Sequence, residues 1–239
     1  MPGTARFLFA AVACVAVTTL AACGGDDEPT VATSTTTSTT STTSTTGATG
    51  TGDAAAAAGG SAFIDLGTGD ASGLEPDDRQ GTAPPEQETD DLEQAADDAA
   101  CQLELDLKDE GNEHIPAKEE AEYDTAPPTS GSHDAVPLAD GAYLDTPQPR
   151  YFVHSLEHGR VVILYQPDLP EEDQLALKGA FEEDPDGMIL TPYPDMPYQV
   201  AAAAWTNFVG CGLYDGGVLD VVRSFRDEFR GNGPEAVPL

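Results

Sequence analysis

The sequence predicts a single compact α+β domain in which a small sheet is flanked by helices. An unbroken apolar run at residues 161–165 is typical of a buried strand. Residues 216–231 carry an apolar stripe at helical spacing and end at a glycine, which predicts a closing helix. Helical and strand patterns occur without regular βαβ alternation, and this favours α+β over α/β.

The other elements are expected in a definite order along the chain. Residues 91–107 predict a helix that leads into a short strand, because their apolar residues first recur at helical spacing. Residues 168–184 predict a helix with Asp168 as its cap, Pro170 in its first turn and acidic residues near its N-terminus. Two further strands are expected, at residues 187–192 and 198–205.

The N-terminal residues predict export from the cytoplasm. Arg6 is followed by an apolar run that has the length of a signal-peptide core and is short for a membrane span. The run ends in Leu20–Cys23, LAAC, which resembles the lipobox of bacterial lipoproteins. Residues 1–22 are therefore expected to be a lipoprotein signal peptide, with an ordinary secretory signal as the alternative. Lipidation of Cys23 would anchor the protein at the extracytoplasmic face of the cell membrane.

A long linker is expected behind the lipid anchor. Residues 23–87 are rich first in Thr, Ser, Gly and Ala and then in Gly, Pro and acidic residues. Such a composition cannot bury enough apolar area to fold, so a disordered tether is predicted. The tether would hold the folded domain, expected at residues 88–235, away from the membrane.

The strong negative charge limits the classes of partner. The formal net charge is −33 at pH 7. Nucleic acid and anionic lipid surfaces are not expected as partners, because no basic cluster is present to meet their phosphate groups. Contact with the membrane is expected only through the N-terminal lipid, and the sequence identifies neither a protein partner nor an oligomeric state.

The four cysteines divide according to the predicted export. Cys14 would be removed with the signal peptide, and Cys23 would carry the lipid. Cys101 and Cys211 remain as an even pair in an oxidising compartment, so a disulfide is expected, with two buried free thiols as the alternative. In the chain-entropy model such a long loop contributes roughly 4–5 kcal/mol to stability, less any strain.

The most distinctive chemistry of the chain lies in its histidines. All four fall in one short stretch of the sequence, at His114, His133, His154 and His158. Prolines and glycines between the first two force a tight path that can bring distant side chains together. Imidazoles suit Cu(II) or Zn(II), so we expect His133, His154 and His158 to be metal ligands, assisted by His114 or Glu157. The alternative is a structural hydrogen-bond network that fastens the proline-rich loop to the strand.

Residues 154–158 also match the H-x-x-E-H string of one class of zinc peptidases, in which a glutamate on the same helix activates water. A catalytic helix of that kind is not expected here. Pro149 lies just upstream and Gly159 follows His158 directly, so at most about one turn of helix is predicted. A third ligand is also not evident. A metal-dependent hydrolase is therefore the third hypothesis, behind a non-enzymatic metal-binding domain and an envelope structural or protein-interaction domain.

Four segments together resemble a known bacterial family. They read YDTAPPTSGSH, GAY, VHSLEHGRVVILY and AAAAWTNFVGCGLYDGGVLDVVRSFRDEFRGNGPE. In these the chain is similar to domain of unknown function 3105, over about Ala99 to Glu235. Members of that family are exported or membrane-anchored, often as lipoproteins, and the resemblance implies no established activity.

The resemblance also implies which residues form the site. The histidine-bearing motifs of the family correspond to His133, His154, Glu157 and His158, with His114 similar to the histidine before the PPTSG loop. The cysteine pair of the family would be Cys101 and Cys211. One departure is that Asp134–Ala135 stands where the family usually has an aromatic residue and a proline. That end of the site is therefore expected to be wetter or more acidic.

Overall fold

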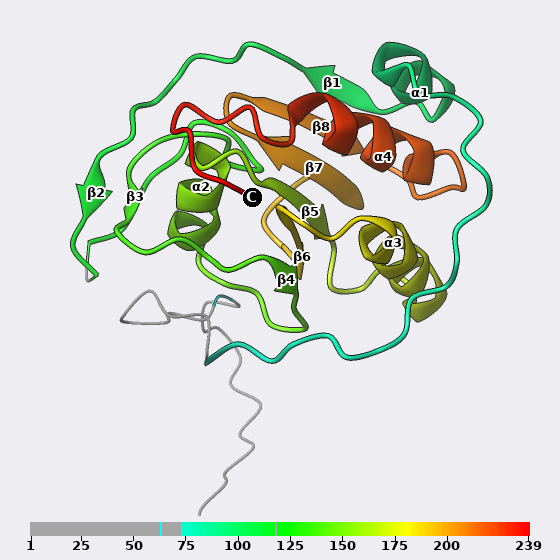
Figure 1. Ribbon diagram of the computed structural model, residues 1–239, viewed down its shortest axis with the longest axis horizontal. Helices are drawn as coiled ribbons and strands as arrows, with labels where there is room; N and C mark the ends of the chain where they lie inside the picture. Colours follow the sequence, from blue (N-terminus) through cyan, green and yellow to red (C-terminus); the bar gives the residue numbers. More distant parts are fainter. Residues whose placement is uncertain (1–62, 64–72, 118) are drawn as a thin grey trace, which may run out of the picture. The chain divides into compact units, whose positions relative to one another are not determined.

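A mixed six-stranded sheet forms the centre of the described part of the chain (Figure 1). The computed structural model describes residue 63, residues 73–117 and residues 119–239. The strands of the sheet are β1 (Gln102–Glu104), β4 (Gly141–Ala142), β5 (Val161–Tyr165), β6 (Met188–Pro192), β7 (Val200–Ala204) and β8 (Asn207–Cys211). Their order is β1-β8-β7-β5-β6-β4, and β5 pairs in parallel with β6 and antiparallel with β7.

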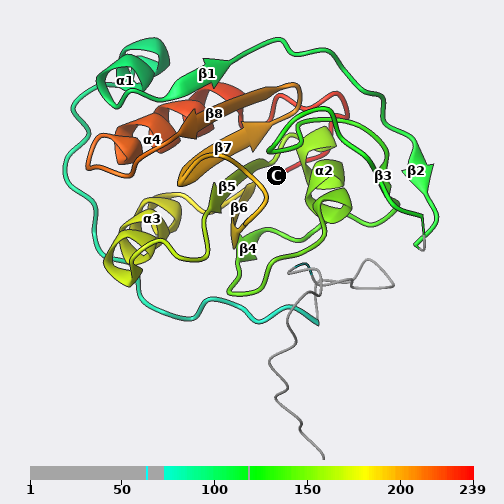
Figure 2. The same cartoon turned by 180° about the vertical axis from the view of Figure 1, so that it is seen from behind.

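Helices cover both faces of this sheet. They are α1 (Leu92–Asp98), α2 (Pro149–Glu157), α3 (Glu171–Glu183) and α4 (Val218–Phe229). The side chains of α1, α3 and α4 pack in one apolar core, while those of α2 pack in a second core on the opposite face (Figures 1 and 2). The predicted α+β class, with a small sheet flanked by helices, is therefore confirmed.

Both faces of strand β5 are buried, which explains why apolar and polar residues do not alternate in its sequence. Val161 and Ile163 point into the core that contains α1, α3 and α4, whereas Val162 and Leu164 point into the core that contains α2. All four side chains are fully buried. Because both faces of the strand need apolar side chains, the segment reads as one continuous apolar run. The predicted buried strand is confirmed.

Most of the other predicted elements are also present. The helix that leads into a short strand is α1 followed by β1, and the two later strands are β6 and β7. The cap assigned to α3 was wrong. Pro170 itself is the cap residue, and no side chain caps this helix; Asp168 lies two residues before the cap position. Strands β4 and β8 had no sequence prediction.

The predicted disulfide between Cys101 and Cys211 is confirmed. Cys101 directly precedes β1, and Cys211 is the last residue of β8, the strand that pairs with β1. The bond therefore fastens the first strand of the sheet to its neighbour across a separation of 110 residues.

The predicted linker boundary was wrong for residues 73–87, which pack against the domain. Leu74 is buried, and Pro76 forms an antiparallel bridge with Tyr143 of the sheet edge. Gly81 lies directly on Gly179 of α3, where an added Cβ would meet the backbone nitrogen of Gly179 at 2.3 Å. The glycines and prolines here allow close approach rather than flexibility, so the folded part begins well before Glu88.

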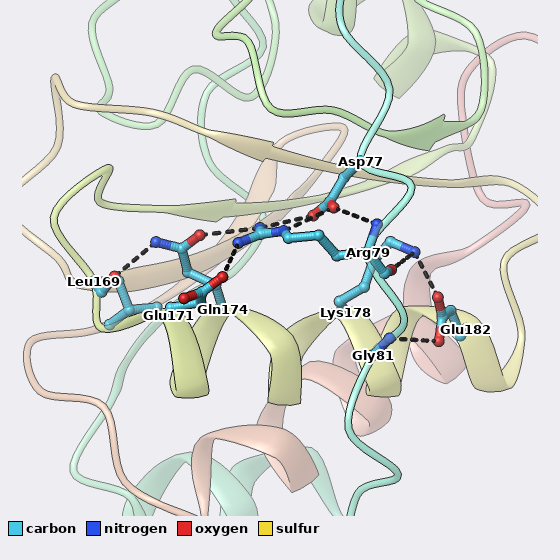
Figure 3. A network of polar contacts seen from close by, with 8 residues as sticks. All are labelled: Asp77, Arg79, Gly81, Leu169, Glu171, Gln174, Lys178 and Glu182. Atoms are coloured by element: carbon cyan, nitrogen blue, oxygen red, sulfur yellow. Dashed lines mark hydrogen bonds and ion pairs between the residues drawn. The ribbon is translucent and has the colours of Figure 1, made fainter.

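A polar network holds the same segment over α3 (Figure 3). Arg79 donates to both carboxylate oxygens of Asp77 at 2.9 Å and to Gln174 at 3.1 Å. Lys178 donates to the backbone carbonyl of Arg79 at 3.2 Å, and the N–H of Gly81 donates to Glu182 at 3.0 Å. The acidic residues that suggested an unfolded linker are thus partly engaged in fixed ion pairs.

The predicted signal peptide, the lipidation site Cys23 and the greater part of the predicted tether lie outside the described residues. Within the described ranges, no helix combines the length and the apolar character that a bilayer-crossing segment needs.

Candidate metal centre

The H-x-x-E-H string lies on α2, at its C-terminal end. His154 and Glu157 belong to the helix, and His158 is its C-cap residue. The prediction of at most about one turn was wrong, because Pro149 occupies the first turn, where its missing N–H costs nothing. Gly159, with φ at +78°, then ends the helix in a conformation that favours glycine.

A two-stranded parallel sheet brings the other two histidines to α2. Its strands, β2 (His114–Ile115) and β3 (His133–Asp134), pair with His114 directly opposite His133. The ring centroids of these two residues are 5.0 Å apart, and the ring of His154 lies 4.9 Å from His114 and 4.7 Å from His133. His158 completes the group, with its ring centroid 4.4 Å from that of His154. The structure thus brings all four histidines together.

Backbone carbonyls fix the orientation of the two buried imidazoles. Nδ1 of His133 lies 2.9 Å from the carbonyl oxygen of Gly131, and Nδ1 of His154 lies 2.7 Å from that of Asp134. A carbonyl oxygen only accepts, so Nδ1 carries the proton in both rings. In the neutral form each ring therefore presents the lone pair of Nε2 to the cluster, as metal-binding histidines commonly do.

Burial keeps His154 in that neutral form. Desolvation by burial is the main cause that lowers the pKa of His154 to about 4; the hydrogen bond to Asp134 opposes this shift, and the neighbouring histidines add to it. At neutral pH the Nε2 atom of His154 is therefore free of a proton and available as a ligand. It lies 3.0 Å from Nε2 of His158.

Glu157 adds a carboxylate to the imidazoles. Its side chain is 1% exposed, and Nδ2 of Asn112 donates to its Oε1 at 2.7 Å. Its Oε2 lies 3.1 Å from Nε2 of His133, yet the two atoms form no hydrogen bond with each other or with any other described residue. Two buried acceptor atoms therefore face each other, which is unfavourable unless a proton or a metal ion lies between them.

The C-terminal segment supplies a further carboxylate, that of Glu235. After α4 the chain returns beside α2 (Figures 1 and 2), and the N–H of Glu235 donates to the carbonyl of Glu157 at 3.1 Å. Oε2 of Glu235 lies 3.3 Å from Nε2 of His158. Sequence reasoning missed both Glu235, which stands far from every histidine in the chain, and Asn112, which lies two residues before His114 but carries no motif of its own. The glycine-rich turn before Glu235 is the one local signal of a close contact there.

The donor atoms fall into two groups. Nitrogen and carboxylate atoms of His114, His133, His154 and Glu157 lie within 4.8 Å of one another, and Glu157, His158 and Glu235 form a second such group. The sequence predicts His158 as a main ligand and His114 as an assisting one. In the structure the larger group contains His114, and His158 belongs to the second group. The four imidazoles and Glu157 are otherwise placed together as expected.

A comparison with protein-family models matches residues 114–237 to a family described as a protein of unknown function, DUF3105. The match covers more than half of the chain. The chain belongs to the DUF3105 family. No curated protein matches the chain, and no solved structure does. The DUF3105 region contains every residue of both donor groups and Cys211, but it begins after Cys101.

The departure from the DUF3105 pattern at Asp134–Ala135 does not make the site wetter. Asp134 is 5% exposed, and its carboxylate accepts from the N–H of Val136 at 3.0 Å. Its carboxylate also lies 4.0 Å from Nη2 of Arg150, which is likewise buried. The expectation of a wetter end was wrong, because the buried arginine provides a partner for the aspartate.

Trp205 lies beside His133 of the histidine cluster in this DUF3105 domain. Its ring meets that of His133 edge-on, with 6.4 Å between the centroids, and its Nε1 donates to Asp109 at 3.4 Å. It is the only tryptophan of the chain. Binding at the cluster can therefore be followed through its fluorescence.

The spacing of the donor atoms fits a transition-metal ion. Two ligands of a tetrahedral zinc ion, each at a typical bond length, lie about 3.3 Å apart. The short donor distances within the groups are 3.1 Å between His133 and Glu157 in the larger group and 3.3 Å between His158 and Glu235 in the second. Three imidazoles and a carboxylate form a donor set suited to Zn(II) or Cu(II).

Proposed function

We propose that the DUF3105 domain of this chain is a non-enzymatic metal-binding domain that takes Zn(II) or Cu(II). The ligands are His114, His133, His154 and Glu157, with His158 beside them. One observation carries the proposal. The buried Nε2 of His133 and Oε2 of Glu157 face each other without a hydrogen bond among the described residues, and a cation is the group that satisfies both.

The burial of three of the four ligands, all except the exposed His114, favours binding over hydrolysis. The side chains of His133, His154 and Glu157 are between 0% and 4% exposed. Structural metal sites are closed by protein ligands, whereas catalytic zinc sites keep one open position for water or substrate. Glu157 also stands among the ligand atoms, so it is not free to activate a water molecule. A metal-dependent hydrolase therefore remains the third hypothesis.

One observation favours the alternative, an envelope structural or protein-interaction domain. The contact of His154 with the carbonyl of Asp134 fastens β3 to α2 without any metal, and the contact of His133 with the carbonyl of Gly131 orders the loop before β3. In this alternative His133 is protonated and forms a buried ion pair with Glu157. The two functions differ in what the cluster binds, so a metal titration separates them.

We also propose that the domain is exported and held at the extracytoplasmic face of the membrane through a lipid on Cys23. The lipobox-like segment before Cys23 supports this, and so does the disulfide between Cys101 and Cys211, because disulfides persist mainly in oxidising compartments. Labelling of producing cells with a radioactive fatty acid tests the anchor. Label in the protein that is lost in Cys23→Ser is expected, and an unlabelled protein would contradict it.

The metal proposal is tested with the full-length, tag-free protein by titration with Cu(II) and Zn(II). Cu(II) is expected to quench the fluorescence of Trp205, because its ring lies 6.4 Å from that of His133, whereas Zn(II) is expected to compete without quenching. Metal at a hundredfold excess over its dissociation constant should raise the free energy of unfolding by about 2.7 kcal/mol, as seen in thermal melts.

Two variants distinguish a specific site from adventitious binding. His114→Gln removes an exposed ligand without disturbing the core and should weaken both the quenching and the thermal shift. Glu113→Gln, at the neighbouring exposed position, is the matched control and should leave both unchanged. Absence of quenching and of any thermal shift in the unmodified protein would overturn the metal proposal and favour the structural alternative.

A further inference from the structure

The C-terminal segment is positioned by a contact that only glycine permits. Gly233 lies against the end of α2, where an added Cβ would meet the carbonyl oxygen of Glu157 and the nitrogen of Gly159, each at 2.2 Å. The N–H of Gly231 donates to the carbonyl of Gly159 at 2.8 Å. This close backbone contact fixes Glu235 beside His158, so the second donor group depends on the fold and not on a freely moving tail.

Glu157 belongs to both donor groups. Ligands of a single zinc ion lie at most about 4.2 Å apart, which is twice a typical zinc–ligand bond. The donors of the larger group and those of His158 and Glu235 are not all within such a distance of one another, since they form two groups at the wider limit of 4.8 Å. One ion therefore cannot use them all, whereas a carboxylate with two oxygens can serve two ions.

We propose that the cluster is a two-metal centre in which Glu157 bridges two divalent ions. The first ion is held by His114, His133 and His154, and the second by His158 and Glu235. This inference rests on the proposed metal-binding function and extends it. The contact from Asn112 to Oε1 of Glu157 does not prevent bridging, because each carboxylate oxygen has two lone pairs.

The two positions differ in their access to solvent. At the first position His133, His154 and Glu157 are buried and only His114 is exposed, whereas the side chains of His158 and Glu235 are 15% and 53% exposed. The second position has fewer protein ligands and completes its coordination with water. It therefore binds more weakly, fills second and exchanges faster. The net charge of −33 favours the accumulation of a second cation at this surface.

The stoichiometry of zinc tests the proposal in the full-length, oxidised protein. Elemental analysis after equilibration with Zn(II) and gel filtration should find about two zinc ions per chain, as in other two-metal sites. Glu235→Gln and His158→Gln should each lower this to about one, without loss of the first ion. Glu228→Gln, an exposed glutamate of α4 with the same change of charge, is the matched control and should retain both ions.

Two further measurements test the second ion and the bridge through Glu157. Gly233→Ala changes no ligand residue but displaces the C-terminal segment that carries Glu235, so it should lose the second ion as Glu235→Gln does. Loading with Cu(II) should give a magnetically coupled electron paramagnetic resonance signal in the unmodified protein and an uncoupled signal in Glu235→Gln, because bridged ions lie about 4 Å apart.

The possible failures are distinguishable. One zinc ion in the unmodified protein, unchanged in Glu235→Gln, would overturn the two-metal centre and leave the proposed function standing. Two ions without magnetic coupling of Cu(II) would reject the bridge through Glu157. No bound metal at all would overturn the proposed function together with this inference.

Discussion

At the scale of single residues, the chemistry of the cluster depends on which nitrogen of each buried imidazole carries a proton. Carbonyl oxygens of Gly131 and Asp134 hold that proton on Nδ1 of His133 and His154. Both Nε2 atoms then point inward as acceptors, and Glu157 adds a third acceptor beside them. Such an arrangement is poor for a metal-free core and well suited to a cation.

Substitution of Glu157 by glutamine distinguishes the two accounts of this cluster. The amide oxygen can still accept from Asn112, and its NH₂ group can donate to Nε2 of His133. Without metal, Glu157→Gln should therefore change the free energy of unfolding by no more than about 1 kcal/mol, or raise it. The thermal shift caused by Zn(II) should be lost.

The measurement is urea unfolding with a chelator, followed by thermal melts with Zn(II). Glu228→Gln is the control for the change of charge, since that carboxylate is exposed. If His133 and Glu157 instead form a buried ion pair, the same substitution should lower the metal-free stability by about 3–5 kcal/mol. A loss of that size would contradict the metal centre.

At the scale of elements, backbone contacts through glycine join segments that lack a regular pairing pattern. The segment at residues 81–82 crosses α3 at Gly179, where an added Cβ would meet the carbonyl oxygen of Thr82 at 1.8 Å. The N–H of Thr82 also donates to the carbonyl of Leu175 at 2.8 Å. The N-terminal segment is therefore part of the folded unit, although its composition is typical of a linker.

This contact reverses the usual effect of replacing a helical glycine. Alanine in a helix interior is ordinarily favoured over glycine by about 1 kcal/mol. At position 179 the new methyl group would overlap the backbone of Thr82, so Gly179→Ala should instead lower the free energy of unfolding by about 1–3 kcal/mol. Urea unfolding measures the change, with Gly216→Ala as the control because a Cβ there meets nothing within 4 Å. A stabilised Gly179→Ala variant would show that residues 73–87 are not packed on α3.

At the scale of the whole molecule, one covalent bond joins distant parts of the described chain. The disulfide of Cys101 and Cys211 links the residue before β1 to the end of β8, and both cysteines contact the core that contains α1 and α4. The histidine cluster lies with α2, whose side chains pack in the other core. The disulfide and the histidine cluster thus lie with different cores of the same sheet.

Loss of the disulfide should weaken the whole domain. The loop between the two cysteines spans 110 residues, for which the chain-entropy model gives about 4–5 kcal/mol. Reduction with dithiothreitol, or the double substitution Cys101→Ser and Cys211→Ser, should lower the unfolding midpoint accordingly. Thiol titration of the denatured, unreduced mature protein should find neither thiol free. An unchanged midpoint after reduction would contradict a stabilising role.

The sequence by itself determined those features that depend on short-range pattern or on elimination. The apolar run of β5 and the stripe of α4 follow from contacts within one segment, which periodicity records. The disulfide followed because only two cysteines remained to pair. The four histidines and Glu157 were recognised as one candidate site because they fill two adjacent motifs.

Only the tertiary structure decided which of these groups meet and what else joins them. The register of β2 and β3 sets His114 opposite His133, and strands of two residues are too short to carry a periodic signal. Pro149 is the first residue of α2, a position where proline does not interrupt a helix. Whether a proline starts or breaks a helix depends on where the helix begins. Glu235 and residues 73–87 reach their places through backbone contacts across more than 60 residues of sequence. Such contacts are set by packing between elements, and no local pattern of side chains records them.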